Sequence, residues 1–145
     1  MKVLAVAHVA FEGVESFGEV LKARGAEITE IVSCLEDISA VDAKEYDLAV
    51  VCGGSMGVYQ ADIFPYLNNE IKFIEQRLKN NLPIIGICLG SQLMAKALGA
   101  QVFATAGGAE KCAACRAFGA DRAIDHLSED FVQVIGEFFT IALVV

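Results

Sequence analysis

Short apolar runs alternate with amphipathic stretches along this chain, which is typical of parallel strands joined by helices. Residues 27–32 alternate between apolar and polar positions and predict an edge strand, and residues 122–124 are a shorter candidate. The other runs of strand length lie at residues 2–7, 47–52, 83–88, 101–105 and 140–145. Apolar positions three and four apart predict helices around residues 17–21, 67–78, 93–98, 109–118 and 128–138.

This alternation predicts one α/β domain over residues 1–145. We expect a three-layer α/β/α sandwich with a doubly wound, mostly parallel sheet, a hybrid of flavodoxin-like and Rossmann-like folds. The first four strands should have the order 2-1-3-4, with strands five and six beyond the fourth. The strand at residues 140–145 is expected either at the far edge of the sheet or paired with a second copy in a homodimer.

Composition and charge narrow the class of partner. Hydrophobic residues make up 55% of the chain and the mean hydropathy is +0.52, as expected for strands buried on both faces. The net charge is −8 and the basic residues are scattered, which argues against a nucleic-acid partner. No apolar run has the length of a membrane span, and the first residues predict a strand rather than a signal peptide. The five cysteines form no secreted disulfide framework, so we expect a cytoplasmic setting.

The most specific motif lies at residues 84–93. An apolar strand there runs into Gly86-x-Cys88-x-Gly90 and a helix begins at once, which is the arrangement of a nucleophile elbow with cysteine as the nucleophile. The two glycines permit a tight turn and a close approach of neighbouring backbone. The helix N-terminus favours negative charge on the Cys88 sulfur. The motif therefore predicts acyl transfer through a thioester.

Residues 1–104 resemble the class I glutamine amidotransferase domain, the free-standing type similar to that of GMP synthase. The segments that carry this resemblance are residues 7–13, 52–59, 65–78 and 86–92. The resemblance implies that Cys88 attacks the side-chain amide of glutamine. It also implies that the backbone N–H groups of Gly54 and Leu89 form the oxyanion hole and that Gln92 contacts the substrate.

A second resemblance begins near residue 101. Residues 102–115 and 118–134 resemble the Rossmann domain of quinone oxidoreductases, which belong to the zinc-type alcohol dehydrogenase superfamily. This implies an amidotransferase-like part at residues 1–100 joined to a Rossmann-like part at residues 101–145. An engineered chimera is the simplest account of such a junction, and a natural fusion is the alternative.

The amidotransferase site is incomplete in the sequence. The resemblance implies a His-x-Glu pair late in the domain, but the two histidines here are His8, in an early loop, and His126, in a His-x-x-Glu sequence of the second part. A thiol nucleophile needs a base that is itself held by an acid. We therefore interpret Cys88 as a vestigial nucleophile.

Cofactor and metal sites are also not predicted. The glycine fingerprint of a dinucleotide site is replaced by the elbow, which leaves Lys111, after Gly107-Gly108, as a weak contact for NADPH. Cys112 and Cys115 lie within one predicted helix and have no evident further ligands, so we expect neither a cofactor nor a metal.

Three functions remain, and we favour a non-catalytic chimeric scaffold. The alternatives are a glutamine amidotransferase-like hydrolase that uses Cys88 and a residual module that binds NADPH or another nucleotide. Whether the chain is an enzyme stays open. Glutamine is the only small molecule that we expect as a natural partner.

Overall fold

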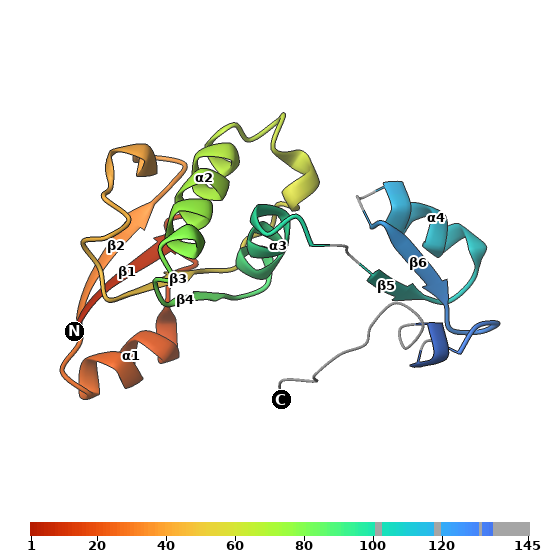
Figure 1. Ribbon diagram of the computed structural model, residues 1–145, viewed down its shortest axis with the longest axis horizontal. Coiled ribbons are helices and arrows are strands. Elements are labelled where there is room, and N and C mark those ends of the chain that lie inside the picture. Colours follow the sequence, from red (N-terminus) through yellow and green to blue (C-terminus); the bar gives the residue numbers. More distant parts are fainter. Residues whose placement is uncertain (101–102, 118–119, 131, 135–145) are drawn as a thin grey trace. The chain divides into compact units, whose positions relative to one another are not determined.

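The computed structural model describes residues 1–100, 103–117, 120–130 and 132–134, which form two compact units, Met1–Ala100 and Gln101–Val145. The first unit contains β1 (Lys2–Ala7), α1 (Glu15–Ala23), β2 (Glu27–Val32), η1 (Ile38–Ala40), β3 (Leu48–Val51), η2 (Val58–Gln60), α2 (Tyr66–Lys79), β4 (Ile84–Gly86) and α3 (Leu89–Ala97). The second contains β5 (Phe103–Ala106), α4 (Ala109–Ala117) and β6 (Arg122–Asp125), all labelled in Figure 1. That the whole chain packs as one domain stays a prediction.

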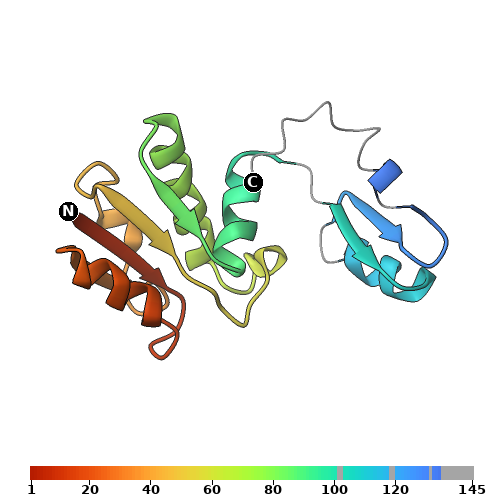
Figure 2. The ribbon, with the colours of Figure 1, turned by 90° about the horizontal axis from the view of Figure 1, so that it is seen from below.

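The first unit has the predicted α/β fold. Its four strands are parallel and follow the order β2-β1-β3-β4, so the expected order 2-1-3-4 is confirmed and β2 is an edge strand. Helix α1 covers one face of the sheet, whereas α2 and α3 cover the other (Figures 1 and 2). These elements make the three layers of an α/β/α sandwich.

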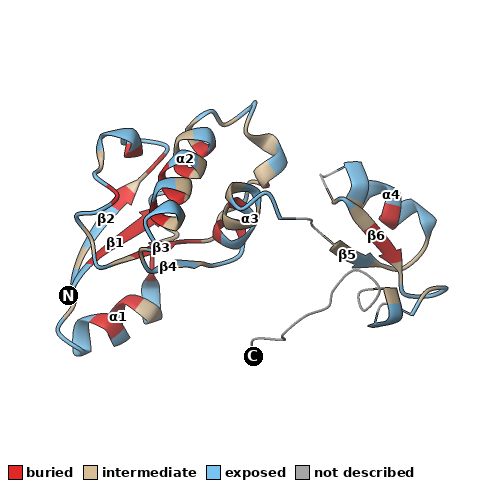
Figure 3. Ribbon diagram, viewed as in Figure 1, coloured by how far each residue is buried: buried red, intermediate tan, exposed pale blue. Residues whose placement is uncertain are grey.

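The alternation of side chains along β1 explains the three layers. Successive side chains of a strand point to opposite faces of the sheet. Val3 and Ala5 lie in the cluster that also holds Leu21 of α1. Leu4 and Val6 lie in the larger cluster with residues of α2 and α3. Both faces of β1 and β3 are therefore buried (Figure 3), which is why these strands read as continuous apolar runs.

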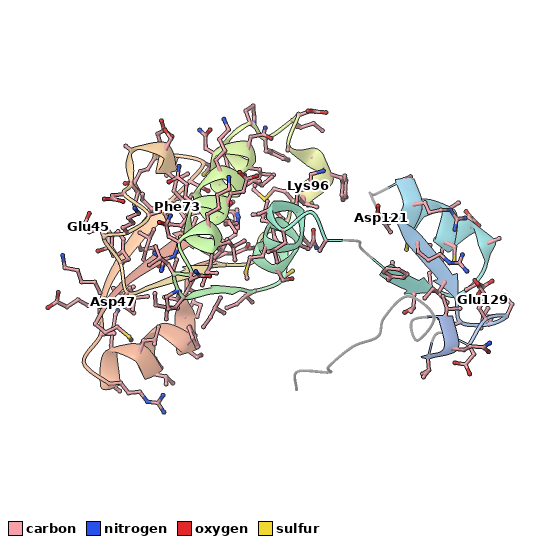
Figure 4. All side chains as sticks on the ribbon, viewed as in Figure 1. Glu45, Asp47, Phe73, Lys96, Asp121 and Glu129 are labelled. Atoms are coloured by element: carbon pink, nitrogen blue, oxygen red, sulfur yellow. The ribbon has the colours of Figure 1, made fainter. Side chains whose placement is uncertain are left out.

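Helix α2 carries both apolar and polar side chains into the interior. Phe73, labelled in Figure 4, is 3% exposed and packs in the larger cluster. Arg77 is completely buried, and its guanidinium donates to three main-chain carbonyls, those of Ala43, Tyr46 and Pro83, at 2.6, 3.1 and 2.7 Å. Arg77 thereby connects α2 to the segments that precede β3 and β4.

The second unit contains strands near the predicted positions, residues 101–105 and 122–124. Strands β5 and β6 are parallel and pair with each other in a two-stranded sheet of their own. That strands five and six lie beyond the fourth strand of the first sheet stays a prediction. The predicted strand at residues 140–145, on which the proposed homodimer rested, lies outside the described residues. No helix in the described part of the chain is both long and apolar enough to cross a membrane.

Candidate functional site

The elbow at the end of β4 has the strained backbone that the motif predicts. Cys88 is the residue before α3 and has φ 51° and ψ −110°, a backbone conformation that residues other than glycine rarely adopt. Its side chain is exposed, whereas Leu89, the next residue, is fully buried. The turn therefore presents the sulfur at the surface directly before the first turn of a helix.

The glycines of the elbow are required by contact with backbone. A Cβ at Gly90 would lie 2.1 Å from the carbonyl oxygen of Val51, and a Cβ at Gly86 would lie 2.6 Å from the carbonyl group of Gly90. The N–H of Gly90 donates to Cys52 O at 3.1 Å, and the N–H of Ile87 donates to Val51 O at 2.9 Å. The elbow is thus held against the carboxyl end of β3.

The Gly53-Gly54 loop lies beside the elbow. A Cβ at Gly53 would be 3.5 Å from Cys88 Cβ, and a Cβ at Gly54 would be 3.0 Å from Leu89 Cδ2. The loop follows β3 and the elbow follows β4, and these neighbouring parallel strands end at the same edge of the sheet. The structure therefore brings together Cys88, Gly54 and Leu89, which are the expected nucleophile and the two expected oxyanion donors.

Gln92, the expected substrate contact, is exposed on the first turn of α3. Its Oε1 accepts a hydrogen bond from the N–H of Val58, in η2, at 3.4 Å. Gln92 consequently bridges the helix that follows the nucleophile and the segment that follows the Gly53-Gly54 loop.

A buried histidine that the sequence placed in an early loop proves to be part of this region. His8 directly follows β1 and is completely buried. Its Nδ1–H donates to Gly53 O at 2.9 Å, and its Nε2–H donates to Glu70 Oε2 at 2.8 Å. Burial alone lowers the pKa of His8, but the hydrogen bond and charge of Glu70, the Gly53 carbonyl and the charge of Glu12 outweigh burial and raise it. His8 and Glu70 thus form a buried ion pair that contacts the Gly53-Gly54 loop.

Sequence reasoning missed this pair, although one signal was present. Glu70 lies three positions after Leu67 and four before Ile74, which places a carboxylate on the buried face of α2. Buried carboxylates need a partner, and a histidine at the end of a central strand is within reach of that helix face. The helix pattern therefore pointed to Glu70, but it did not identify its partner.

Another buried group of the site is a thiol. Cys52 directly follows β3, beside the elbow, and is 2% exposed. Burial, followed by the charges of Glu30 and Glu70, raises the pKa of Cys52 to about 11. Cys52 is therefore protonated at neutral pH, whereas Cys88, the expected nucleophile, is exposed.

The second unit places the remaining expected residues in a different setting. His126 is exposed, and Glu129 does not hold it: the Glu129 carboxylate pairs with Arg122 and accepts the N–H of Asp125 at 2.9 Å (Figure 4 labels Glu129). Lys111 is exposed on α4. Glu129 therefore does not serve His126 as the glutamate of a His-x-Glu base would.

In the loop before Lys111, the Gly108 N–H already has a carboxylate as its hydrogen-bond acceptor. Asp125 Oδ1 accepts the N–H of Gly108 at 2.9 Å and that of Leu127 at 3.1 Å. These two bonds, the first being the larger effect, hold the pKa of Asp125 below its ordinary value. A phosphate of NADPH would need the Gly108 N–H, which already donates to the Asp125 carboxylate. The loop therefore does not fit NADPH.

Neither cysteine of the Cys112-x-x-Cys115 sequence forms a disulfide, and both lie in α4. Cys112 is buried and Cys115 is partly exposed. In the described ranges, no group of three or more histidine, cysteine or acidic side chains could hold a metal ion.

Comparison with known proteins agrees with the geometry of the first unit. The profile of the glutamine amidotransferase class-I family matches residues 12–136. The glutamine amidotransferase-like protein YfeJ of Salmonella typhimurium is 33% identical over 105 residues, which are 70% of this chain and 44% of that protein. A similar protein, L716 of Acanthamoeba polyphaga mimivirus, is 35% identical over 66 residues, 46% of this chain and 32% of its own length.

A solved structure gives the same result. The crystal structure of a glutamine amidotransferase from Thermotoga maritima superposes with a TM-score of 0.64 at 34% identity, covering 68% of this chain and 43% of that one. This chain thus spans less than half the length of these relatives.

The family match also bears on the predicted junction. Residues 12–136 include the position near residue 100, and the comparisons give no support for a quinone oxidoreductase segment or for a chimera. The sequence match, the parallel sheet and the cysteine elbow agree with one another. The chain belongs to the class I glutamine amidotransferase family.

Proposed function

We propose that this chain binds the side chain of glutamine and is acylated by it at Cys88, with little turnover of its own. In the proposed reaction, Cys88 Sγ bonds to the amide carbon and the N–H groups of Gly54 and Leu89 donate to the oxygen. The carbon–nitrogen bond then breaks and the nitrogen leaves as ammonia with the thiol proton. Water hydrolyses the thioester to glutamate.

One observation carries this proposal, namely the strained elbow at Cys88 beside the Gly53-Gly54 loop. The φ of 51° at Cys88 and the contact distances of Gly53 and Gly54 support a nucleophile next to backbone donors. An oxyanion donor is worth roughly 3 kcal/mol of transition-state stabilisation. Such a site supports attack on an amide even where the later steps are slow.

Slow turnover is proposed because neither histidine of the chain is available as an oriented base. His8 is buried with both ring nitrogens in hydrogen bonds, and the carboxylate near His126 is held by Arg122. General base catalysis contributes typically 10²- to 10⁴-fold to the rate. We therefore expect ammonia release far below that of a complete amidotransferase.

The test is labelling with a chloroketone analogue of glutamine, read by mass spectrometry of each cysteine peptide. We expect saturable labelling of Cys88 that is much faster than labelling of Cys34, which is also exposed. Iodoacetamide serves as the reagent that lacks a glutamine side chain. Equal chloroketone rates at Cys88 and Cys34, or a Cys88 rate that rises linearly with concentration, would contradict the proposal.

The predicted junction near residue 100 also remains a proposal. It is supported by the second sequence resemblance and by the division of the chain between Ala100 and Gln101. If the two parts fold separately, the unfolding transition seen by tyrosine fluorescence will differ from that seen by circular dichroism. A single coincident transition would contradict independent parts. The cytoplasmic setting likewise stays a prediction.

A further inference from the structure

We propose that His8 and Glu70 are positioning residues for the chemistry of Cys88, because they fix the loop that carries one oxyanion donor. The inference rests on the proposed function of Cys88. It goes beyond that function by assigning a role in the reaction to a buried ion pair that touches neither the nucleophile nor the substrate. Three contacts connect this pair to the expected oxyanion donor.

The first contact joins His8 to the loop. His8 follows β1 and Gly53 follows β3, which are paired neighbours in the sheet, so both lie at the same edge. The Gly53 carbonyl can only accept a hydrogen bond, so His8 Nδ1 carries a hydrogen in the 2.9 Å contact. This bond fixes the peptide that joins Gly53 to Gly54, whose N–H is the expected donor.

The second contact is the packing around Gly54. A Cβ at Gly54 would lie 3.2 Å from His8 Cβ, 3.3 Å from His8 Cγ and 3.0 Å from Leu89 Cδ2. Gly54 is therefore packed closely against both the His8 side chain and Leu89 of the elbow. Movement of the His8 ring would change the distance from the Gly54 N–H to the carbon that Cys88 attacks.

The third contact joins Glu70 to His8. Its Oε2 accepts the Nε2–H of His8 at 2.8 Å, and both side chains are at most 1% exposed. With both ring nitrogens in hydrogen bonds, the imidazole has one orientation. A buried ion pair is weak evidence of stabilisation, since desolvation offsets much of the attraction between the charges. Orientation of the loop is an effect of this pair that does not depend on its net stability.

Two substitutions at His8 separate the two hydrogen bonds. Asparagine places an amide nitrogen near the position of Nδ1, so His8→Asn keeps a donor for Gly53 and loses the hydrogen bond to Glu70. Glutamine places its nitrogen near Nε2, so His8→Gln keeps a donor for Glu70 and loses the hydrogen bond to Gly53. Ser33→Ala is the matched control: Ser33 is 5% exposed at the same edge, and its hydroxyl donates to Ala7 O at 3.1 Å, away from the loop.

Two reagents distinguish positioning from a structural role. The chloroketone analogue of glutamine forms a carbon–sulfur bond and releases chloride after its carbonyl oxygen has gained negative charge, so its rate depends on the oxyanion donors. Iodoacetamide is attacked at a methylene carbon with loss of iodide and no oxyanion. Its rate reports only the exposure and reactivity of the thiol.

We expect His8→Gln to lower the maximal chloroketone rate at Cys88 about tenfold or more, part of the roughly 100-fold cost of removing one oxyanion donor. The iodoacetamide rate should change less than about twofold. His8→Asn, which keeps the bond to Gly53 but loses the one to Glu70, should lower the chloroketone rate less than His8→Gln does, and Ser33→Ala should keep both rates. Equal slowing with both reagents, or no change in His8→Gln, would overturn the inference.

The failure of the proposed function is distinguishable from the failure of this inference. If the wild-type chain shows no selective chloroketone labelling, the proposed function is wrong. Positioning is then decided by hydrogen exchange of the Gly54 amide. Faster exchange in His8→Gln than in Ser33→Ala supports the fixed loop, and equal exchange overturns it. If His8→Gln does not fold, the same comparison uses His8→Asn, which loses the bond to Glu70. Faster exchange than in Ser33→Ala then supports the fixed loop, and equal exchange overturns the inference.

Discussion

Gly90→Ala tests whether the elbow is held against β3 by close backbone contact. The new Cβ would lie 2.1 Å from Val51 O, 2.8 Å from Val51 C and 3.1 Å from Cys52 O. Overpacking against an interior typically costs about 1–3 kcal/mol, and contact with main-chain atoms favours the upper end of that range. Alanine recovers less than about 1 kcal/mol through its better helix propensity. We therefore expect the free energy of unfolding to fall by roughly 2–3 kcal/mol.

Gly99→Ala is the matched control at the other end of α3. Gly99 has φ +62° and nothing within 4 Å of its added Cβ, so alanine there adds left-handed strain of about 1 kcal/mol and no collision. The assay is urea unfolding followed by tyrosine fluorescence. The chain has no tryptophan, and its three tyrosines lie in the first unit. The Gly90→Ala midpoint should fall by roughly 1–2 M. A midpoint equal to or above that of Gly99→Ala would refute the contact.

Three further predictions concern buried or bonded polar groups. Arg77→Ala removes the donors to three carbonyls, so we expect the free energy of unfolding by urea to fall by about 3 kcal/mol or more, and an unchanged midpoint would contradict this. The interactions that raise the pKa of His8 stabilise the fold fully below about pH 6.5, and that stabilisation is lost as pH rises through the pKa of His8 in the folded state. The wild-type urea midpoint should therefore fall from about pH 7 to 9 more than that of His8→Asn, and parallel profiles would count against the ion pair. We also expect no saturable change in NADPH fluorescence, since Asp125 occupies the Gly108 amide; saturable binding that is lost in Lys111→Glu would show the opposite.

Much of the first unit was predictable because its local signals agree with its long-range packing. Continuous apolar runs at β1 and β3 reflect burial on two faces, and the alternating run at β2 reflects its place at an edge. The elbow was predictable because Gly90 is required by its contact with Val51 of the neighbouring strand, and Gly86 by its contact with Gly90. At such positions, a short sequence motif records a tertiary contact.

The loop–histidine contact was not predictable in the same way. His8 and Gly53 are 45 residues apart, and His8 and Glu70 are 62 apart, so no local spacing links them. The strand order brings them together. The strand pairing of the second unit was not predictable for a related reason. Apolar runs at β5 and β6 predict strands, but their sequence does not say which strand each one pairs with, and here they pair with each other.

The central claim, that the Cys88 elbow recognises the glutamine side chain, is tested most directly by protection. Chloroketone labelling of Cys88 is measured at increasing concentrations of L-glutamine, with D-glutamine as the matched competitor. We predict that L-glutamine slows labelling to a saturable limit and that D-glutamine does so far less. Equal rates with and without L-glutamine, at any concentration, would contradict the claim and leave Cys88 as an exposed thiol without a substrate site.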